Sequence, residues 1–160
     1  MRMRRLPHLD ARGRPRMVDV SEKQVTSRTA TAQGLLTCKL ETLAQVQEGT
    51  APKGSVIRTA EIAGIMAAKR TSELIPLCHP LPLTNVDLRI DIDEGLPGFK
   101  VEASVRTNSV TGVEMEALTA TSIACLTLFD MLKAIDRTMI ISGIEVTSKT
   151  GGKSGDWHRE

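Results

Sequence analysis

A cysteine and a histidine stand between two prolines in the segment 76–80, Pro-Leu-Cys-His-Pro. Proline fixes its own φ angle and favours an extended conformation in the residue before it, so a rigid loop is expected here. In an extended segment the adjacent side chains of Cys78 and His79 point in opposite directions, which disfavours joint binding of one metal ion. Two interpretations of His79 stay open: a histidine satisfied within its own loop, or one that contacts a ligand.

Two glutamates, Glu114 and Glu116, lie two positions apart in the segment 111–116, Thr-Gly-Val-Glu-Met-Glu. On an extended chain they share a face, whereas in a helix they diverge by about 200 degrees. Acidic residues at a helix N-terminus also complement the helix dipole without any further function. A structural role therefore stays open beside a role in the chemistry of a site.

Asp130 and Lys133 are three positions apart in a segment with helical spacing, so they are neighbours on one face. Most such pairs are solvated and contribute only about 0.2–0.5 kcal/mol. The surrounding residues are mostly Ala, Leu, Ile and Thr. We therefore expect the pair in a low dielectric environment, where a carboxylate pKa rises and a lysine pKa falls, as proton transfer near pH 7 requires.

Two basic segments are rich in glycine: Lys53-Gly54, and residues 149–155, Lys-Thr-Gly-Gly-Lys-Ser-Gly. Glycines let backbone N–H groups approach a phosphate, and lysines supply positive charge. The spacing does not fit the Walker A motif of nucleotide-binding loops. A Gly/Lys/Ser segment is also typical of a flexible chain end, so the pattern alone is weak evidence for a phosphate site.

The composition argues against a nucleic-acid or membrane-surface protein. The 160 residues include 21 Lys plus Arg and 19 Asp plus Glu, a net charge of +2, which is too even for either class. Phe99, Phe129 and Trp157 are the only aromatic residues of the Phe, Trp and Tyr types, too few for a platform on which bases stack. An anionic ligand must therefore be held by a local cluster of cations.

The cysteines and the apolar runs bear on localisation. Cys38, Cys78 and Cys125 are far apart and form no C-x-x-C arrangement, so neither a disulfide framework nor a zinc ribbon is indicated. No apolar run is expected to reach the length of a membrane span, and the Arg-rich start lacks the apolar part of a secretory signal. We expect a cytoplasmic protein.

The elements that must position these residues follow from hydrophobic periodicity. Residues 85–93 and 99–106 alternate apolar and polar side chains around a Gly/Pro turn, which predicts an antiparallel hairpin with one buried face. Further strands are expected at 33–40 and 139–149. Helices are expected at 41–48, at 59–71 with Thr59 as a possible N-cap, and at about 116–135.

The order strand, helix, strand, strand, helix, strand predicts an α+β ferredoxin-like sandwich, an antiparallel sheet covered by helices. We expect a mobile N-terminal arm at 1–16, a single domain at 17–160 and, within it, a flexible Gly-rich C-terminal loop at 150–156.

Several segments, taken together and in this order, resemble the cyclic pyranopterin monophosphate synthase family. The resemblance covers about residues 17 to 158, and its most unusual strings are Ile-Pro-Leu-Cys-His-Pro at 75–80 and Thr-Gly-Val-Glu-Met-Glu-Ala-Leu-Thr-Ala at 111–120. The other matching segments are 17–20, 63–65, 67–71, 130–131, 133–134 and 148–156. In one departure, Ser109-Val110 stands where many members have Gly-Lys, which leaves the exact phosphate contacts open.

The resemblance implies a homohexamer, a trimer of dimers with active sites at dimer interfaces, and neither a cofactor nor a metal ion. It implies conversion of (8S)-3′,8-cyclo-7,8-dihydroguanosine 5′-triphosphate, a cyclic dihydro-GTP, to cyclic pyranopterin monophosphate plus pyrophosphate in molybdenum cofactor biosynthesis. The imidazole ring of the guanine opens and the product recloses as a pyranopterin. The expected partner is thus a small molecule, with no nucleic acid and no membrane.

The resemblance also assigns roles, and we expect the clusters described above to converge on the substrate. Asp130 matches the catalytic acid/base of the family, and Lys53 and Lys133 match lysines implicated in turnover. The residues expected to be catalytic are Asp130, Lys133, Lys53 and Glu114. Those expected to bind substrate are Leu77, Cys78, His79, Met115, Glu116, Lys149, Arg28 and Lys153.

Two alternatives come from other classes. A catalytically silent oligomeric module that binds nucleotides or acidic ligands could keep the basic segments, but has no reason to pair Asp130 with Lys133. A metal-dependent phosphohydrolase could use His79, Glu114 and Glu116, and its activity or folding would collapse with a chelator.

Overall fold

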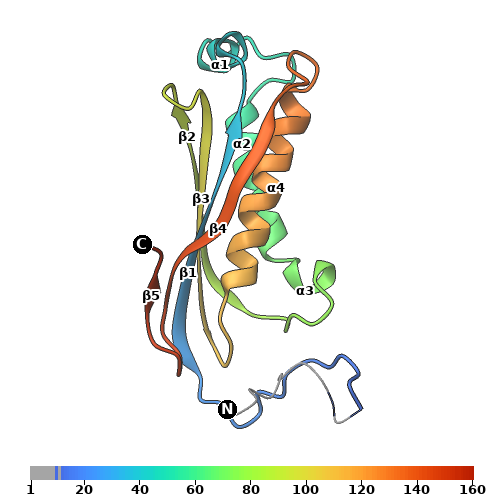
Figure 1. Cartoon of the computed structure of the whole chain (residues 1–160), viewed down its shortest axis with the longest axis vertical. Coiled ribbons are helices and arrows are strands. Elements are labelled where there is room, and N and C mark those ends of the chain that lie inside the picture. Colours follow the sequence, from blue (N-terminus) through green and yellow to red (C-terminus); the bar gives the residue numbers. More distant parts are fainter. Residues whose placement is uncertain (1–9, 11) are drawn as a thin grey trace.

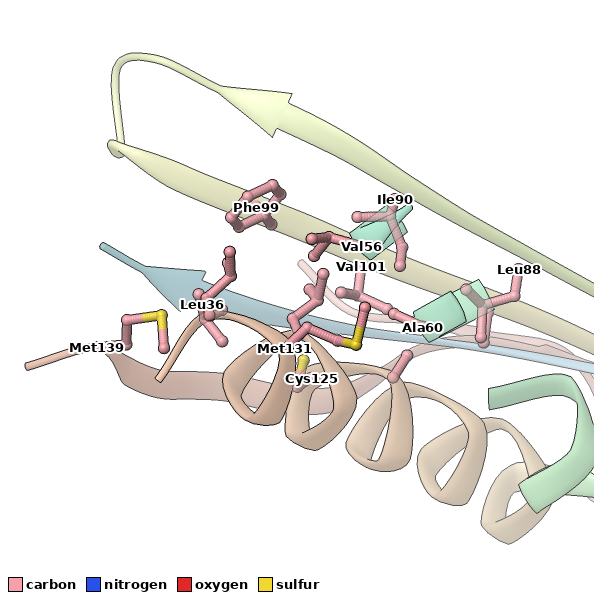
Figure 2. Close-up of a cluster of buried hydrophobic side chains, with 14 of the residues drawn as sticks. Leu36, Val56, Ala60, Leu88, Ile90, Phe99, Val101, Cys125, Met131 and Met139 are labelled. Carbon is pink, nitrogen blue, oxygen red and sulfur yellow. The ribbon is translucent and has the colours of Figure 1, made fainter. Parts of the chain in front are cut away.

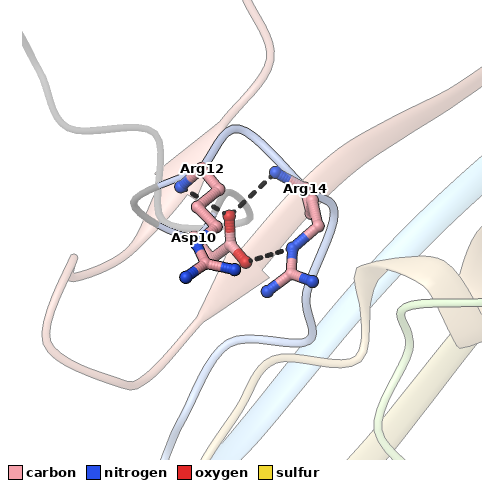
Figure 3. Close-up of polar contacts among 3 residues, drawn as sticks. All are labelled: Asp10, Arg12 and Arg14. Atoms are coloured by element: carbon pink, nitrogen blue, oxygen red, sulfur yellow. Dashed lines mark hydrogen bonds and ion pairs between the residues drawn. The ribbon is translucent and has the colours of Figure 1, made fainter.

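The computed structural model describes residue 10 and residues 12–160. Most of the predicted N-terminal arm, residues 1–9 and 11, lies outside the described residues. In the described part of the predicted arm, Asp10 closes a local turn (Figure 3). Its carboxylate accepts hydrogen bonds from the backbone N–H groups of Arg12 and Arg14 at 2.8 and 2.9 Å, and pairs with the Arg14 guanidinium at 2.8 Å.

The predicted ferredoxin-like α+β sandwich is confirmed. Five strands form one antiparallel sheet in the order β2-β3-β1-β4-β5, and α2 and α4 cover one of its faces (Figure 1). The strands are β1 (Thr26–Thr37), β2 (Leu83–Asp93), β3 (Gly98–Ser109), β4 (Ile140–Thr150) and β5 (Trp157–His158). The helices are α1 (Leu40–Gln47), α2 (Val56–Ala68), α3 (Thr71–Leu74) and α4 (Glu114–Leu132).

The hairpin was predicted most completely. Alternate residues of β3 are buried from Phe99 to Val105, while Lys100 and Glu102 are exposed. The apolar residues of β2 and β3 pack against α2 and α4 to form the main core (Figure 2). Period-two patterning is sufficient here because only one face of the sheet carries helices.

Three predicted boundaries were wrong. The first strand begins at Thr26 rather than residue 33, because its first half consists of Thr, Ser, Arg and Ala and lacks large apolar residues, although Ala30 and Ala32 are fully buried. Helix α2 begins at Val56, so Thr59 is inside the helix rather than its N-cap, and its hydroxyl donates to the Ser55 carbonyl oxygen at 2.8 Å. The chain after Ala68 turns into the short α3 instead of continuing the helix to residue 71.

Helix α4 is the central helix of the core. By length and composition it qualifies as a candidate membrane span, so the expectation that no apolar run reaches that length was wrong. However, its Ala120, Cys125, Leu128 and Leu132 are completely buried. Helix α2 approaches it closely at Gly64, where a Cβ atom would collide with Leu88 and the Ala120 carbonyl oxygen. This explains the apolar composition without a bilayer.

Beyond the C-terminal end of α4, Asp136 ties the following loop to the start of α1. Its buried carboxylate accepts the Lys39 N–H at 2.9 Å, the Thr138 N–H at 2.9 Å and the Thr42 hydroxyl at 3.3 Å. Burial alone would raise the pKa of Asp136, but these hydrogen bonds outweigh it and lower the pKa to about 2. The charged carboxylate of Asp136 therefore fastens the loop after α4 to the start of α1.

Candidate active site

Two adjoining cavities lie at the N-terminal end of α4. The smaller has a volume of about 190 Å³ and is lined mainly by polar residues from β1, β4 and the loops beside them. The larger, of about 480 Å³, adds the loop 77–81 and the segment 18–20. The two cavities share the lining residues Lys23, Thr111, Gly112 and Glu114.

The polar cavity holds cations in fixed positions. Lys149, on β4, lies with its Nζ 3.4 Å from Oε1 of Glu114 and donates to the Ser154 hydroxyl at 2.9 Å. Arg28, on β1, donates through Nε to the Ser109 carbonyl oxygen at 2.9 Å. Gly112 leaves room for the Glu114 carboxylate, because a Cβ atom at this position would fall on it. Charged groups held in this way are suited to a polyphosphate.

The larger cavity combines an apolar wall with a few polar groups. Val18, Val20, Leu77, Leu81 and Met115 provide the apolar surface. In the rigid Pro-Leu-Cys-His-Pro loop, His79 Nε2 lies 2.8 Å from the Val18 carbonyl oxygen, which fixes the ring against the segment 18–20. Such a surface with few convergent polar groups is typical of a site for a small ring compound.

The two glutamates stand on α4 itself, since the helix begins at Glu114, and both line the larger cavity. Glu116 is only 4% exposed. Its burial, and to a smaller extent the charge of Glu114, raise the pKa of Glu116 to about 7. Burial and the Glu116 charge also raise the pKa of Cys78. Glu116 can therefore exchange a proton near neutral pH, whereas Cys78 is held as a thiol.

A second charged cluster lies at the other end of α4. Asp130 pairs with Lys53 at 2.9 Å and with Lys133 at 2.7 Å, and Lys53 also donates to the Asp130 carbonyl oxygen at 2.9 Å. The side chains are 55% exposed for Asp130, 41% for Lys53 and 54% for Lys133. The hydrogen bond from Lys133, followed by that from Lys53, lowers the pKa of Asp130 to about 2.

The predicted low dielectric around Asp130 and Lys133 was therefore wrong for this chain. Met131 and Leu132 take the core positions of the last helical turn, so Asp130 and Lys133 are left on the solvent side. The hydrogen bonds and positive charges of Lys133 and Lys53 lower the carboxylate pKa, in the direction opposite to the expected shift.

The expected convergence of all the clusters does not occur within one chain. Asp130 lies sixteen residues after Glu114 on a continuous helix, which places the two ends of α4 about 24 Å apart. The 77–79 loop, both glutamates, Arg28 and Lys149 come together at one end, whereas Lys53, Asp130 and Lys133 gather at the other. Lys53 and Lys149, which belong to the two basic glycine-rich segments, are thus separated.

Comparison with known proteins gives the same family as the sequence motifs. Residues 17–152 match the model of the MoaC family. A cyclic pyranopterin monophosphate synthase of Brucella ovis is 59% identical over 153 residues, which are 96% of this chain and 93% of that protein. The protein of the same name from Cereibacter sphaeroides is 59% identical over 150 residues, 94% of each chain. This chain belongs to the MoaC family.

Membership of the MoaC family confirms the recognition made from the motifs, but the placement of two lysines differs from what those motifs indicated. Lys153 is exposed and lines neither cavity. Lys23 lines both cavities and was missed by sequence reasoning, which stopped at the segment 17–20 three residues earlier. In the sequence, Lys23 is a single lysine in a polar stretch, and hydrophobic periodicity does not distinguish such a residue.

Within residue 10 and residues 12–160, no group of three His, Cys, Asp or Glu side chains is placed to hold one metal ion. Glu114 is paired with Lys149, and His79 is turned to a backbone carbonyl oxygen. The phosphohydrolase alternative therefore gains no support from the described part of the chain.

Proposed function

We propose that this chain is a cyclic pyranopterin monophosphate synthase, a pyrophosphate-releasing lyase of molybdenum cofactor biosynthesis. Its substrate in this proposal is (8S)-3′,8-cyclo-7,8-dihydroguanosine 5′-triphosphate. The observation that carries the proposal is the pair of adjoining cavities in a MoaC-family chain: a polar cavity with Arg28 and Lys149, beside a larger cavity that contains the buried Glu116.

The two cavities match the two parts of this substrate. The triphosphate binds in the polar cavity, where Arg28, Lys149 and Lys23 supply positive charge and an arginine side chain suits bidentate contact with phosphate. The guanine ring, which becomes the pterin, binds in the larger cavity against Leu77 and Met115. His79 and Cys78 contact it from the rigid loop.

Opening the imidazole ring and closing the pyranopterin require groups that accept and donate protons. Glu116 has a pKa close to 7 in this fold, so it serves either direction at neutral pH. Glu114, held by Lys149, is the second carboxylate on this side. Asp130 and Lys133 provide the proton-transfer pair of the other cluster, and Lys53 acts with them rather than with Lys149.

The distance between the clusters makes a second subunit part of the proposal. Because about 24 Å of helix separates them, one substrate contacts both only where the N-terminal end of α4 in one chain meets the C-terminal end in another. We propose a homohexamer, a trimer of dimers, with active sites at the dimer interfaces. Exposed apolar residues on the helical layer support self-association: Ile62, Met66, Leu74 and Leu126 are each more than half exposed.

Burial of the second cluster by a partner subunit also accounts for its chemistry. Asp130, Lys53 and Lys133 are solvated in the single chain, and removal of that water strengthens their electrostatic interactions with a substrate. The low dielectric that the sequence suggested is then a property of the assembly. We place this enzyme in the cytoplasm.

The test is turnover of enzymatically prepared cyclic dihydro-GTP by the purified chain, followed as pyrophosphate release and pterin formation. Turnover by the wild type, retained in EDTA and lost in Asp130→Asn, supports the synthase. Tight binding without turnover in the wild type identifies the silent binding module instead. Loss of activity with EDTA favours the phosphohydrolase.

A further inference from the structure

The loop 151–156, between β4 and β5, is closed by one of its own side chains. Oδ1 of Asp156 accepts a hydrogen bond from the Gly151 N–H at 2.9 Å, across the whole loop. Inside this ring, the Gly155 N–H donates to the Gly152 carbonyl oxygen at 3.2 Å. The carboxylate therefore joins the first residue of the loop to its last.

The chain beyond Asp156 is fastened to β4. Trp157 pairs with Lys149, and His158 with Ser148. Arg159 then donates its backbone N–H to the Thr147 carbonyl oxygen at 2.8 Å and forms an ion pair with Glu145 at 3.2 Å. Both strands that flank the loop are thus held in register, and Asp156 is the last group before the pairing begins.

The loop forms one wall of the polar cavity. Gly151 passes so close to the Ser27 carbonyl oxygen, and Gly152 so close to the Arg28 guanidinium, that a Cβ atom on either would collide. Both glycines have positive φ angles, 83° and 80°. Ser154 is positioned to receive the hydrogen bond from Lys149. The conformation of the loop therefore contributes to where Arg28 and Lys149 point, beside their contacts with Ser109 and Glu114.

Asp156 itself lines neither cavity. A carboxylate beside a cationic cavity weakens the attraction of that cavity for an anion, so its charge alone does not favour phosphate binding. Its hydrogen bond with the Gly151 N–H instead keeps the loop ordered. A loop that is already ordered spares a ligand the entropy cost of ordering it.

We propose that Asp156 is a positioning residue, which holds the loop 151–156 closed so that Arg28, Lys149 and Ser154 face the cavity before a polyphosphate chain enters. This inference rests on the proposed function for the identity of the ligand. It makes the loop a preformed wall of the phosphate site rather than a lid that orders only on binding.

The experiment compares Asp156→Ala, which removes the acceptor, with Asp156→Asn, which keeps an oxygen acceptor and removes the charge. Asp93→Ala is the matched control, because Asp93 accepts the Gly95 and Leu96 N–H groups in the exposed turn between β2 and β3. Binding of inorganic tripolyphosphate is measured by calorimetry. Quenching by acrylamide reports on β5, since Trp157 is the only tryptophan and the chain has no tyrosine.

Asp156→Ala is expected to weaken tripolyphosphate binding and raise KM by roughly three- to tenfold, the effect of one lost hydrogen bond, with kcat unchanged. Trp157 becomes easier to quench. Asp156→Asn stays within about twofold of the wild type, since the acceptor is kept. Asp93→Ala matches the wild type in all three measurements.

Three results overturn the inference: no binding of tripolyphosphate by the wild type, unchanged binding and quenching in Asp156→Ala, or equal loss in Asp156→Asn and Asp156→Ala. A fall in kcat without a change in KM also contradicts it. Absence of turnover in the wild type instead defeats the proposed function, and the calorimetry and fluorescence then still decide the role of Asp156.

Discussion

The two ends of α4 carry the same kinds of charged side chain in opposite surroundings. At the N-terminal end, Glu116 is buried, and Lys149 is fixed by both Glu114 and Ser154 beside two cavities. At the C-terminal end, Asp130 and its two lysines are about half exposed and are held mainly by one another. In the proposed shared site, the fold of one chain completes one half, and the other half requires a partner surface that covers it.

The two ends of α4 also differ in the pKa of their carboxyl groups. Burial raises the pKa of Glu116 to about 7, whereas the ion pairs of an exposed Asp130 lower its pKa to about 2. A carboxylate is thus tuned toward neutrality only where the chain itself removes water. The contrast predicts that substitutions at the two ends fail in different ways.

The largest effect is expected at the exposed end. Lys133→Ala should lower kcat by roughly 10²- to 10⁴-fold, the usual contribution of a positioned proton-transfer group. The variant should keep the fold of the single chain, because the Lys133–Asp130 ion pair is about half exposed there and contributes little to its stability. Steady-state kinetics and calorimetric melting check the two halves of this statement. Unchanged kcat would remove Lys133 from the mechanism.

At the buried end, Glu116→Gln should change the dependence of stability on pH. The folded-state pKa of about 7 lies above the ordinary value of 4.5, so the wild type loses stability as the pH rises from about 4.5 to 7. Glutamine carries no charge to bury and does not lose this stability. The variant should therefore gain on the wild type by about 2.5 kcal/mol between pH 5 and pH 8.

Urea unfolding at fixed protein concentration measures this difference, because the midpoint of an oligomer depends on concentration. Asp130→Asn is the control, since the pKa of Asp130 is lowered to about 2 and its carboxylate stays charged in the folded and unfolded states throughout this pH range. A constant difference between Glu116→Gln and the wild type across this pH range would show that Glu116 is not held neutral by burial.

The smallest predicted effects concern the KM values of variants at Lys149 and Lys153, two lysines of the segment 149–155. Lys149→Ala should raise KM by about ten- to a hundredfold, as expected for a hydrogen-bonded charge contact. Lys153→Ala should raise it by less than about threefold, because the side chain is exposed and outside both cavities. Substrate titrations of the two variants decide this. Equal effects would mean that the loop changes conformation when substrate binds.

The sequence predicted the elements whose pattern is periodic. The β2–β3 hairpin alternates because only one of its faces is covered, and α1 and α4 were found within a few residues. The first half of β1 was missed because its buried positions are filled by Ala. Without large apolar residues, it lacks the alternating hydrophobic pattern that predicts a strand. The start of α2 was misplaced because Ser55, rather than Thr59, is the N-cap residue. Ser55 makes no side-chain hydrogen bond at this position.

The sequence named candidate site residues, whose catalytic roles stay a prediction, but it did not give their places in the fold. The motifs named Glu114, Glu116, Asp130 and Lys133, and the family confirms the motifs. However, the local sequence does not show which other elements lie at each end of a helix. The convergence of the four clusters on one substrate was therefore an assumption. The exposure of Asp130 depends on which neighbours occupy the core positions, and Lys23 reaches the cavities only through tertiary structure.

The most direct test of a site shared between two chains is complementation between its halves. Lys133→Ala and Glu114→Gln are co-expressed with different tags, and oligomers that contain both are isolated and assayed. If each site takes one half from each of two chains, about one quarter of the sites in an equal mixture combine two intact halves. With sites shared in this way, activity is expected to return to about one quarter of the wild-type value. Mixed oligomers as inactive as either parent would contradict it.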